Sequence, residues 1–76
     1  MNKKITKLDL LGLKCPFPVL KTMKKLKEIS SNQLLEVKID DNNSIKDFKQ
    51  LSKDKKIILV DFKKHNKFLF FLIKRV

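Results

Sequence analysis

Two prolines, Pro16 and Pro18, constrain the fold of this 76-residue chain more than any other feature. Proline lacks a backbone N–H, so a helix tolerates it in the first turn, where that group has no partner within the helix. With Pro16 at the first helical position, Cys15 becomes the N-cap residue, and the helix is expected to extend to about Ile29. Its predicted apolar face consists of Val19, Leu20, Met23 and Leu26.

Alternating apolar and polar residues predict strands in much of the remaining chain. We expect these strands at residues 5–11, 35–39, 57–62 and 68–74. A second, short helix is expected at about 45–52, after the capping residues 40–44. Residues 63–66 are expected to form the turn of a C-terminal hairpin, in which Asn66 adopts a positive φ angle.

This β-α-β-α-β-β order predicts an α/β two-layer sandwich, with a four-stranded mixed sheet and two helices on one face. A right-handed first crossover makes the first two strands parallel, while the final hairpin is antiparallel. Without repeats or linkers, the chain is expected to form a single domain, residues 1–76. A domain of this size has no room for a deep cleft, so a carrier, a binding module or a subunit is favoured.

The last strand is apolar on both of its faces. One alternating set is Phe68, Phe70 and Leu72, and the other is Leu69, Phe71 and Ile73. A sheet with helices on one face needs only one such set. Two explanations stay open. The second set forms a partner or self-association surface, or the codon usage of an AT-rich genome increases the number of exposed apolar residues.

The chain is strongly basic, with a net charge of +11 and a pI of about 10.0. Such a charge attracts polyanions and would favour weak contact with tRNA. However, 18 of the 19 basic residues are lysines, and phosphate recognition tends to favour arginine. Compositional drift toward lysine, combined with solubility, is the alternative explanation.

Cysteine content and hydropathy predict the compartment. One cysteine cannot form an internal disulfide, which favours a reducing, cytoplasmic location. The longest apolar run is residues 68–73, far short of the ~20 residues that a spanning helix needs, so no membrane insertion is expected. Charged residues interrupt the N-terminal apolar stretch, which argues against a signal peptide.

Cys15 is the candidate catalytic residue. A lone cysteine is more often a buried structural residue, but a helix N-terminus carries about half a positive charge and favours the thiolate. The backbone N–H groups of Phe17 and Val19 are expected to face an anion held there. Lys14 and Lys21 could add positive charge as supporting residues. Together these features predict a thiol pKa lowered into the range of about 3.5 to 7.5.

Other chemistries lack the residues that they need. His65, the only histidine, is expected in the hairpin turn, which argues against a Cys–His dyad. One cysteine and one histidine do not make a convincing zinc site. A single glycine, Gly12, excludes a glycine-rich phosphate loop, and no cofactor is expected. The acidic residues Asp40, Asp41 and Asp47 are interpreted as helix caps and dipole compensation.

The run from Leu8 to Lys21, which contains Cys-Pro-Phe-Pro, resembles the TusA family (also called SirA or YeeD-like) of small bacterial sulfur carrier proteins. The family motif is Cys-Pro-x-Pro after a Leu/Gly/Leu lead and before a helix. The resemblance continues at the three aspartates 40, 41 and 47 and at residues 71–74. Phe17 stands where the family often has glutamate, and Asn32–Gln33 replaces a usual glycine.

The resemblance implies the same βαβαββ sandwich and a sulfurtransferase activity in which Cys15 carries sulfane sulfur as a persulfide. It implies a PLP-dependent cysteine desulfurase as donor and a downstream relay protein as acceptor, in a pathway to tRNA 2-thiouridine. Other branches of the family serve thiosulfate uptake, sulfur oxidation or selenium handling. Pro16 and Pro18 would shape the loop around Cys15. The alternative function is a small basic RNA-binding or regulatory interaction module.

Overall fold

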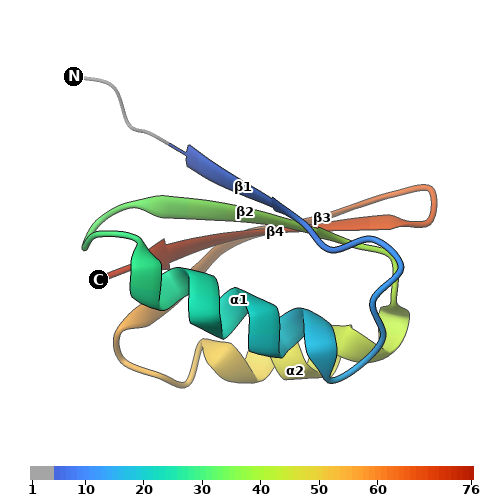
Figure 1. The fold of residues 1–76 in the computed structure, drawn as a ribbon, viewed down its shortest axis with the longest axis horizontal. Helices are drawn as coiled ribbons and strands as arrows, with labels where there is room; N and C mark the ends of the chain where they lie inside the picture. The colour runs from blue at the N-terminus through green and yellow to red at the C-terminus, as the bar shows by residue number, and fades with distance from the viewer. Residues whose placement is uncertain (1–4) are drawn as a thin grey trace.

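The computed structural model describes residues 5–76, which form a four-stranded sheet with both helices on one face (Figure 1). The elements are β1 (Ile5–Asp9), α1 (Phe17–Glu28), β2 (Leu34–Ile39), the 3₁₀ turn η1 (Asn42–Ser44), α2 (Ile45–Leu51), β3 (Ile57–His65) and β4 (Phe68–Arg75). The strand order is β1-β2-β4-β3, with β1 parallel to β2 and β4 antiparallel to both neighbours. The predicted βαβαββ sandwich is therefore confirmed. Neither described helix is long and apolar enough to cross a membrane.

The core lies between the helices and the two central strands. Alternate residues of β2 (Leu35, Val37, Ile39) and β4 (Leu69, Phe71, Ile73) are at most 1% exposed. From α2, Phe48 stacks on Phe71, with ring centroids 4.4 Å apart and planes inclined by 12°. Burying a side chain of this size contributes about 1.5–3 kcal/mol to stability. This contact holds α2 against the sheet and fixes the residue before Phe48, which is Asp47.

The buried face of α1 differs from the predicted one. Pro18, Thr22 and Leu26, four residues apart, are buried. Thr22 is tolerated there because its hydroxyl donates a hydrogen bond to the Pro18 carbonyl at 2.8 Å. Leu20 and Met23, predicted to face the core, are 53% and 42% exposed. The apolar residues of α1 cover more of the helix than one face, so their spacing alone does not decide which are buried.

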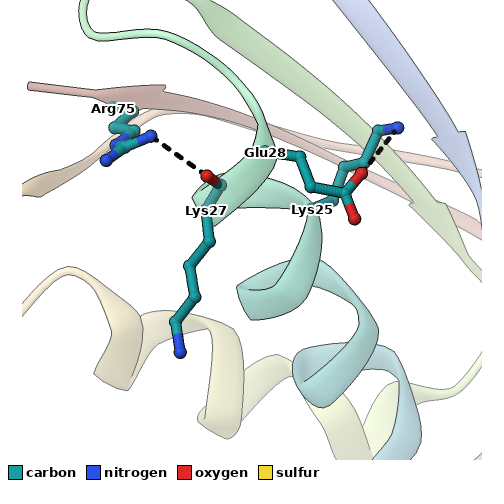
Figure 2. Close-up of polar contacts among 4 residues, drawn as sticks. All are labelled: Lys25, Lys27, Glu28 and Arg75. Atoms are coloured by element: carbon teal, nitrogen blue, oxygen red, sulfur yellow. Dashed lines mark hydrogen bonds and ion pairs between the residues drawn. The ribbon is translucent and has the colours of Figure 1, made fainter.

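The C-terminal end of α1 is held by Arg75, the only arginine of the chain. Its guanidinium donates to the carbonyl of Lys27 at 3.4 Å, and also to the carbonyl of Ile29. Figure 2 shows the Arg75–Lys27 bond beside a 3.4 Å ion pair between Lys25 and Glu28. A cation at this end of a helix satisfies free carbonyls and offsets the dipole. Arg75 is thus engaged within the fold, which leaves the lysines as the cations for a polyanion.

The C-terminal hairpin turns later than predicted. β3 continues to His65, which pairs with Phe68, and the turn consists of Asn66 and Lys67. Residues 63–65, predicted as part of the turn, are therefore extended. Asn66 has a φ of 56°, as predicted, and a positive φ suits a two-residue hairpin turn because it matches the strand twist. The polar run 63–65 is typical of a turn, but it is also tolerated at the exposed end of a strand, and here it continues β3.

The open face of the sheet is only partly covered. Phe68, Phe70 and Leu72, the second apolar set of β4, are half-buried. The Lys38 ammonium lies 4.7 Å from the centre of the Phe68 ring and 5.8 Å from that of Phe70. Lysine stems commonly cover apolar surface in this way while the charge stays in water. Self-association through this hairpin stays a prediction.

Candidate functional site

Cys15 lies in the loop between β1 and α1, where its free thiol is exposed. β1 ends at Asp9, two residues earlier than predicted, and Gly12 adopts a φ of +85°, which glycine tolerates without steric cost. The Gly12 N–H donates to the Asp40 carboxylate at 3.1 Å. In Figure 1 this loop turns from the sheet toward the first turn of α1, beside the segment before α2.

The helix begins one residue later than predicted. Pro16, not Cys15, is the N-cap residue of α1, and Pro18 occupies the first helical turn. The Phe17 N–H, predicted to face an anion held at Cys15, donates instead to the Lys14 carbonyl at 2.8 Å. The prolines thus define the helix start, but Cys15 lies just outside it, where the helix dipole acts on it less directly.

Two carboxylates from the other side of the site hold Cys15. Its backbone N–H donates to Asp41 Oδ2 at 2.7 Å, and its thiol donates to Asp47 Oδ2 at 2.8 Å. Asp41 also caps η1, since its carboxylate accepts the N–H of Asn43 and the hydroxyl of Ser44, each at 3.2 Å. The predicted capping role of Asp41 is confirmed, but Asp47 also contacts the thiol.

These carboxylates determine the electrostatics of the thiol. The hydrogen bond to Asp47 raises the pKa of Cys15, and desolvation and the charges of Asp47 and Asp41 act in the same direction. The predicted lowering of the thiol pKa is therefore wrong for the free protein. Sequence reasoning counted Lys14 and the helix dipole, whereas the nearest charged atoms belong to aspartates that lie 26 and 32 residues away in sequence.

The pKa of Asp41 moves the opposite way. The hydrogen bond from the Cys15 N–H lowers it most, although desolvation opposes this effect. The hydrogen bonds from Asn43 and Ser44 and the charge of Lys14 lower it further. Asp41 therefore stays ionised at neutral pH and keeps its negative charge beside Cys15.

The predicted supporting residues lie at different distances from this contact. Lys14 precedes Cys15 and acts on Asp41, whereas Lys21 is exposed on α1. Within residues 5–76, no hydrogen bond or ion pair joins Lys21 to Cys15 or to either aspartate.

Pro16 lines an open hollow of about 270 Å³ between α1 and α2. Its other lining residues are Val19, Met23, Asp47, Gln50 and Leu51. The supporting roles stay predictions.

Exposed apolar side chains lie on α1, the helix that follows Cys15. Phe17 is 55% exposed, and Leu20 and Met23 on the following turns are exposed by 53% and 42%. They form an apolar strip along α1, which we define as Phe17, Leu20 and Met23. The described part of the chain contains no group of three or more His, Cys, Asp or Glu side chains placed to hold a metal ion.

The contacts at the candidate site that sequence reasoning missed are those of Asp41 and Asp47 with Cys15. Periodicity and capping rules place each aspartate within its own helix and say nothing about contacts across the fold. The signal that could have found them is the family resemblance, which extended to the same aspartates. The fold makes these contacts possible, because the β1–α1 loop and the segment after β2 meet at one end of the sheet (Figure 1).

Comparison with known proteins identifies the family of the chain. A family model described as sulfurtransferase TusA matches residues 6–75. The sulfur carrier protein TusA of Allochromatium vinosum is 40% identical over 68 residues, which cover 90% of each chain. Two Bacillus subtilis (strain 168) proteins named as candidate sulfur carriers are also similar. YrkF is 36% identical over 70% of this chain and 29% of its own length. YrkI is 41% identical over 60% of this chain and 61% of its own length. The chain therefore belongs to the TusA family of sulfur carrier proteins.

Proposed function

We propose that this chain, acting as one domain over residues 1–76, carries sulfane sulfur as a persulfide on Cys15. The observation that supports this most directly is the exposure of Cys15, the only thiol of the chain, within the Cys-Pro-x-Pro segment of a TusA-family domain. A carrier thiol must be reached by two different proteins in turn. An exposed loop cysteine meets that requirement, and an enclosed one does not.

The transfer chemistry needs only one thiol from this protein. The sulfur of Cys15 attacks the outer sulfur of a donor persulfide, a new S–S bond forms, and the S–S bond of the donor breaks. The inner sulfur of the donor persulfide leaves with the electron pair as a thiolate, and it takes up the proton that Cys15 released. No external oxidant or reductant is consumed, because a sulfur atom and a proton simply exchange places. Delivery to an acceptor thiol repeats the same step with Cys15 as donor.

The proposed donor is a cysteine desulfurase, and the proposed acceptor is a downstream relay protein that leads to tRNA 2-thiouridine. The apolar strip supports a protein donor or acceptor, since it exposes three large side chains on the helix that follows Cys15. Pro16 and Pro18 would hold the loop in position, and Lys14 and Lys21 would contact acidic groups of a partner.

Loading is tested by intact-protein mass spectrometry. The protein is incubated with cysteine, PLP and a cysteine desulfurase, and then measured without reductant. We expect a gain of one sulfur atom that a reductant removes. The Cys15→Ser variant should gain nothing, and since the chain has no other cysteine the comparison is unambiguous. A variant that still gained the sulfur, or a wild-type protein that never did, would refute the proposal.

A second candidate function is contact with single-stranded RNA at the β3–β4 hairpin. Lys38 and Lys67 lie 4.7 and 5.9 Å from the centre of the Phe68 ring, and Lys63 and Lys64 lie on the same hairpin. Aromatic rings among cations are typical of surfaces that bind single strands. The hairpin also lies at the end of the sheet where β2 leads toward the Cys15 site, since the last residue of β2 pairs near the start of β4.

This contact is tested by fluorescence anisotropy with a single-stranded RNA at several salt concentrations. Replacing Lys63, Lys64 and Lys67 by glutamine should weaken binding. It should also reduce the slope of log affinity against log salt concentration by about 0.7 for each lost phosphate contact. A triple variant at Lys49, Lys53 and Lys55, exposed outside the hairpin, has the same net charge. Equal losses in the two variants would mean that net charge alone attracts RNA, which would contradict a hairpin site.

A further inference from the structure

We propose that Asp47 makes Cys15 selective for sulfur donors that bring a positively charged group to the thiol, although the protein as a whole is strongly basic. The inference rests on the proposed function, in which Cys15 accepts sulfur. It goes further because it states which chemistry the donor must present at the point of transfer.

The geometry of the contact is fixed from both sides. Asp47 lies in the first turn of α2, half-buried, and the next residue, Phe48, is fully buried against Phe71. Cys15 is held by its own N–H, which donates to Asp41 at 2.7 Å. The 2.8 Å contact between the thiol and Asp47 Oδ2 therefore joins two anchored segments. It does not depend on a long, freely rotating surface side chain.

The charge near Cys15 is opposite in sign to that of the whole molecule. The chain carries 19 basic and 8 acidic residues, yet Asp40, Asp41 and Asp47 gather at this loop. The groups that face Cys15 are Asp47 from α2 and Asp41 from the segment before η1, and Lys14 precedes it in sequence. The attacking species is the thiolate, and the two carboxylates oppose the negative charge that deprotonation places on the Cys15 sulfur.

Magnitudes argue against Asp47 as a general base. An ordinary carboxyl has a pKa near 3.9 and an ordinary thiol one near 8.5, so moving the proton from sulfur to carboxylate is disfavoured by roughly 10⁴-fold or more. A catalytic base works best with a pKa near the operating pH. Asp47 therefore keeps the free thiol protonated, since its hydrogen bond raises the pKa of Cys15.

This arrangement discriminates between donors. A donor that places an ammonium or guanidinium group beside Asp47 offsets the carboxylate, releases the hydrogen bond and favours the thiolate at the moment of transfer. A small anionic persulfide or polysulfide brings further negative charge and leaves the thiol protonated. Cys15 is then less reactive toward free sulfur species than its exposure suggests, and more reactive toward a donor with a cationic group at its transfer site.

The test measures the local charge at Cys15 without any sulfur donor. Two methanethiosulfonate reagents that differ in charge, trimethylammonioethyl and sulfonatoethyl, modify the thiol, and the ratio of their rates reports the potential at the sulfur. We expect Asp47→Asn to lower the cation-to-anion rate ratio roughly threefold or more, and to raise the rate of iodoacetamide alkylation at pH 7 by a similar factor. Asp47→Ser should do the same, so the result does not rest on one substitution.

Glu28→Gln is the matched control. It removes one negative charge in the same way, but it lies at the far end of α1 from Cys15, in an exposed pair with Lys25. Its rate ratio should equal that of the wild type. An unchanged ratio in both Asp47 variants, or an equal change in Glu28→Gln, would overturn the inference even if the desulfurase loads sulfur onto Cys15. Failure of that loading would instead refute the proposed function.

Discussion

The Asp41 carboxylate joins two loops, since it accepts the Cys15 N–H at 2.7 Å and caps η1 through Asn43 at 3.2 Å. The two loops are 26 residues apart in sequence. One side chain therefore fixes both the position of the thiol and the start of the segment that carries Asp47. Stability and thiol geometry are coupled through this residue.

Replacing Asp41 with alanine should destabilise the fold by about 1 kcal/mol at pH 7, the usual effect of losing a helix cap. The folded-state pKa of Asp41 is lowered below its ordinary value of 3.8, mainly by the hydrogen bond from Cys15. Its ionic contribution is therefore present above that ordinary value and is lost as the pH falls through the folded-state pKa. Urea denaturation at pH 7 and pH 3 measures this. If the difference in unfolding free energy between wild type and variant were no smaller at pH 3 than at pH 7, the prediction would be contradicted.

Sequence patterns predicted the fold better than the site. The alternation in β2 and β4 and the two prolines gave the order of elements, because each depends only on local geometry. The rotation of α1, which exposes Leu20 and Met23, was not predictable from spacing, since several faces are apolar. The sign of the thiol pKa shift was wrong because it depends on Asp47, a contact made only when the chain has folded.

Replacing Phe48 with alanine should cost about 3–5 kcal/mol, because the side chain is fully buried and stacks on Phe71 at 4.4 Å. A domain this small has little stability to spare. We therefore expect a large loss of folded protein in a chemical denaturation experiment. Leu20→Ala, at a position 53% exposed, should change stability by less than about 0.5 kcal/mol. Similar effects of the two substitutions would mean that Phe48 is not part of the core.

Cys15 should react more slowly in the folded protein than in the unfolded chain. The hydrogen bond to Asp47 raises the pKa of the folded thiol, so less thiolate is present at pH 7. Iodoacetamide alkylation with and without urea at the same pH measures the difference, with a short cysteine peptide correcting for the effect of urea on the reagent. Faster alkylation in the folded state would contradict the raised pKa.

The same shift predicts a change of stability in alkali. A group whose folded-state pKa is raised contributes stability that is present below its unfolded pKa and lost as the pH rises through the folded value. The wild type should therefore lose this contribution above the ordinary thiol pKa of about 8.5, whereas Cys15→Ser should not. Denaturation of both proteins from pH 7 to pH 10 provides the measurement. Parallel curves would show that the thiol does not contribute.

The apolar strip of α1 should contribute to donor binding and not to folding. Replacing Leu20 with serine removes an apolar side chain that is 53% exposed on α1, so stability should change by less than about 0.5 kcal/mol. We expect Leu20 to be one of the few interface residues whose truncation costs more than about 1 kcal/mol, so the desulfurase concentration for half-maximal loading should rise roughly fivefold or more. Ile58→Ser is the matched control, because Ile58 is 47% exposed but lies on the edge strand β3. If Ile58→Ser weakened loading as much as Leu20→Ser, the donor would not be recognised through α1.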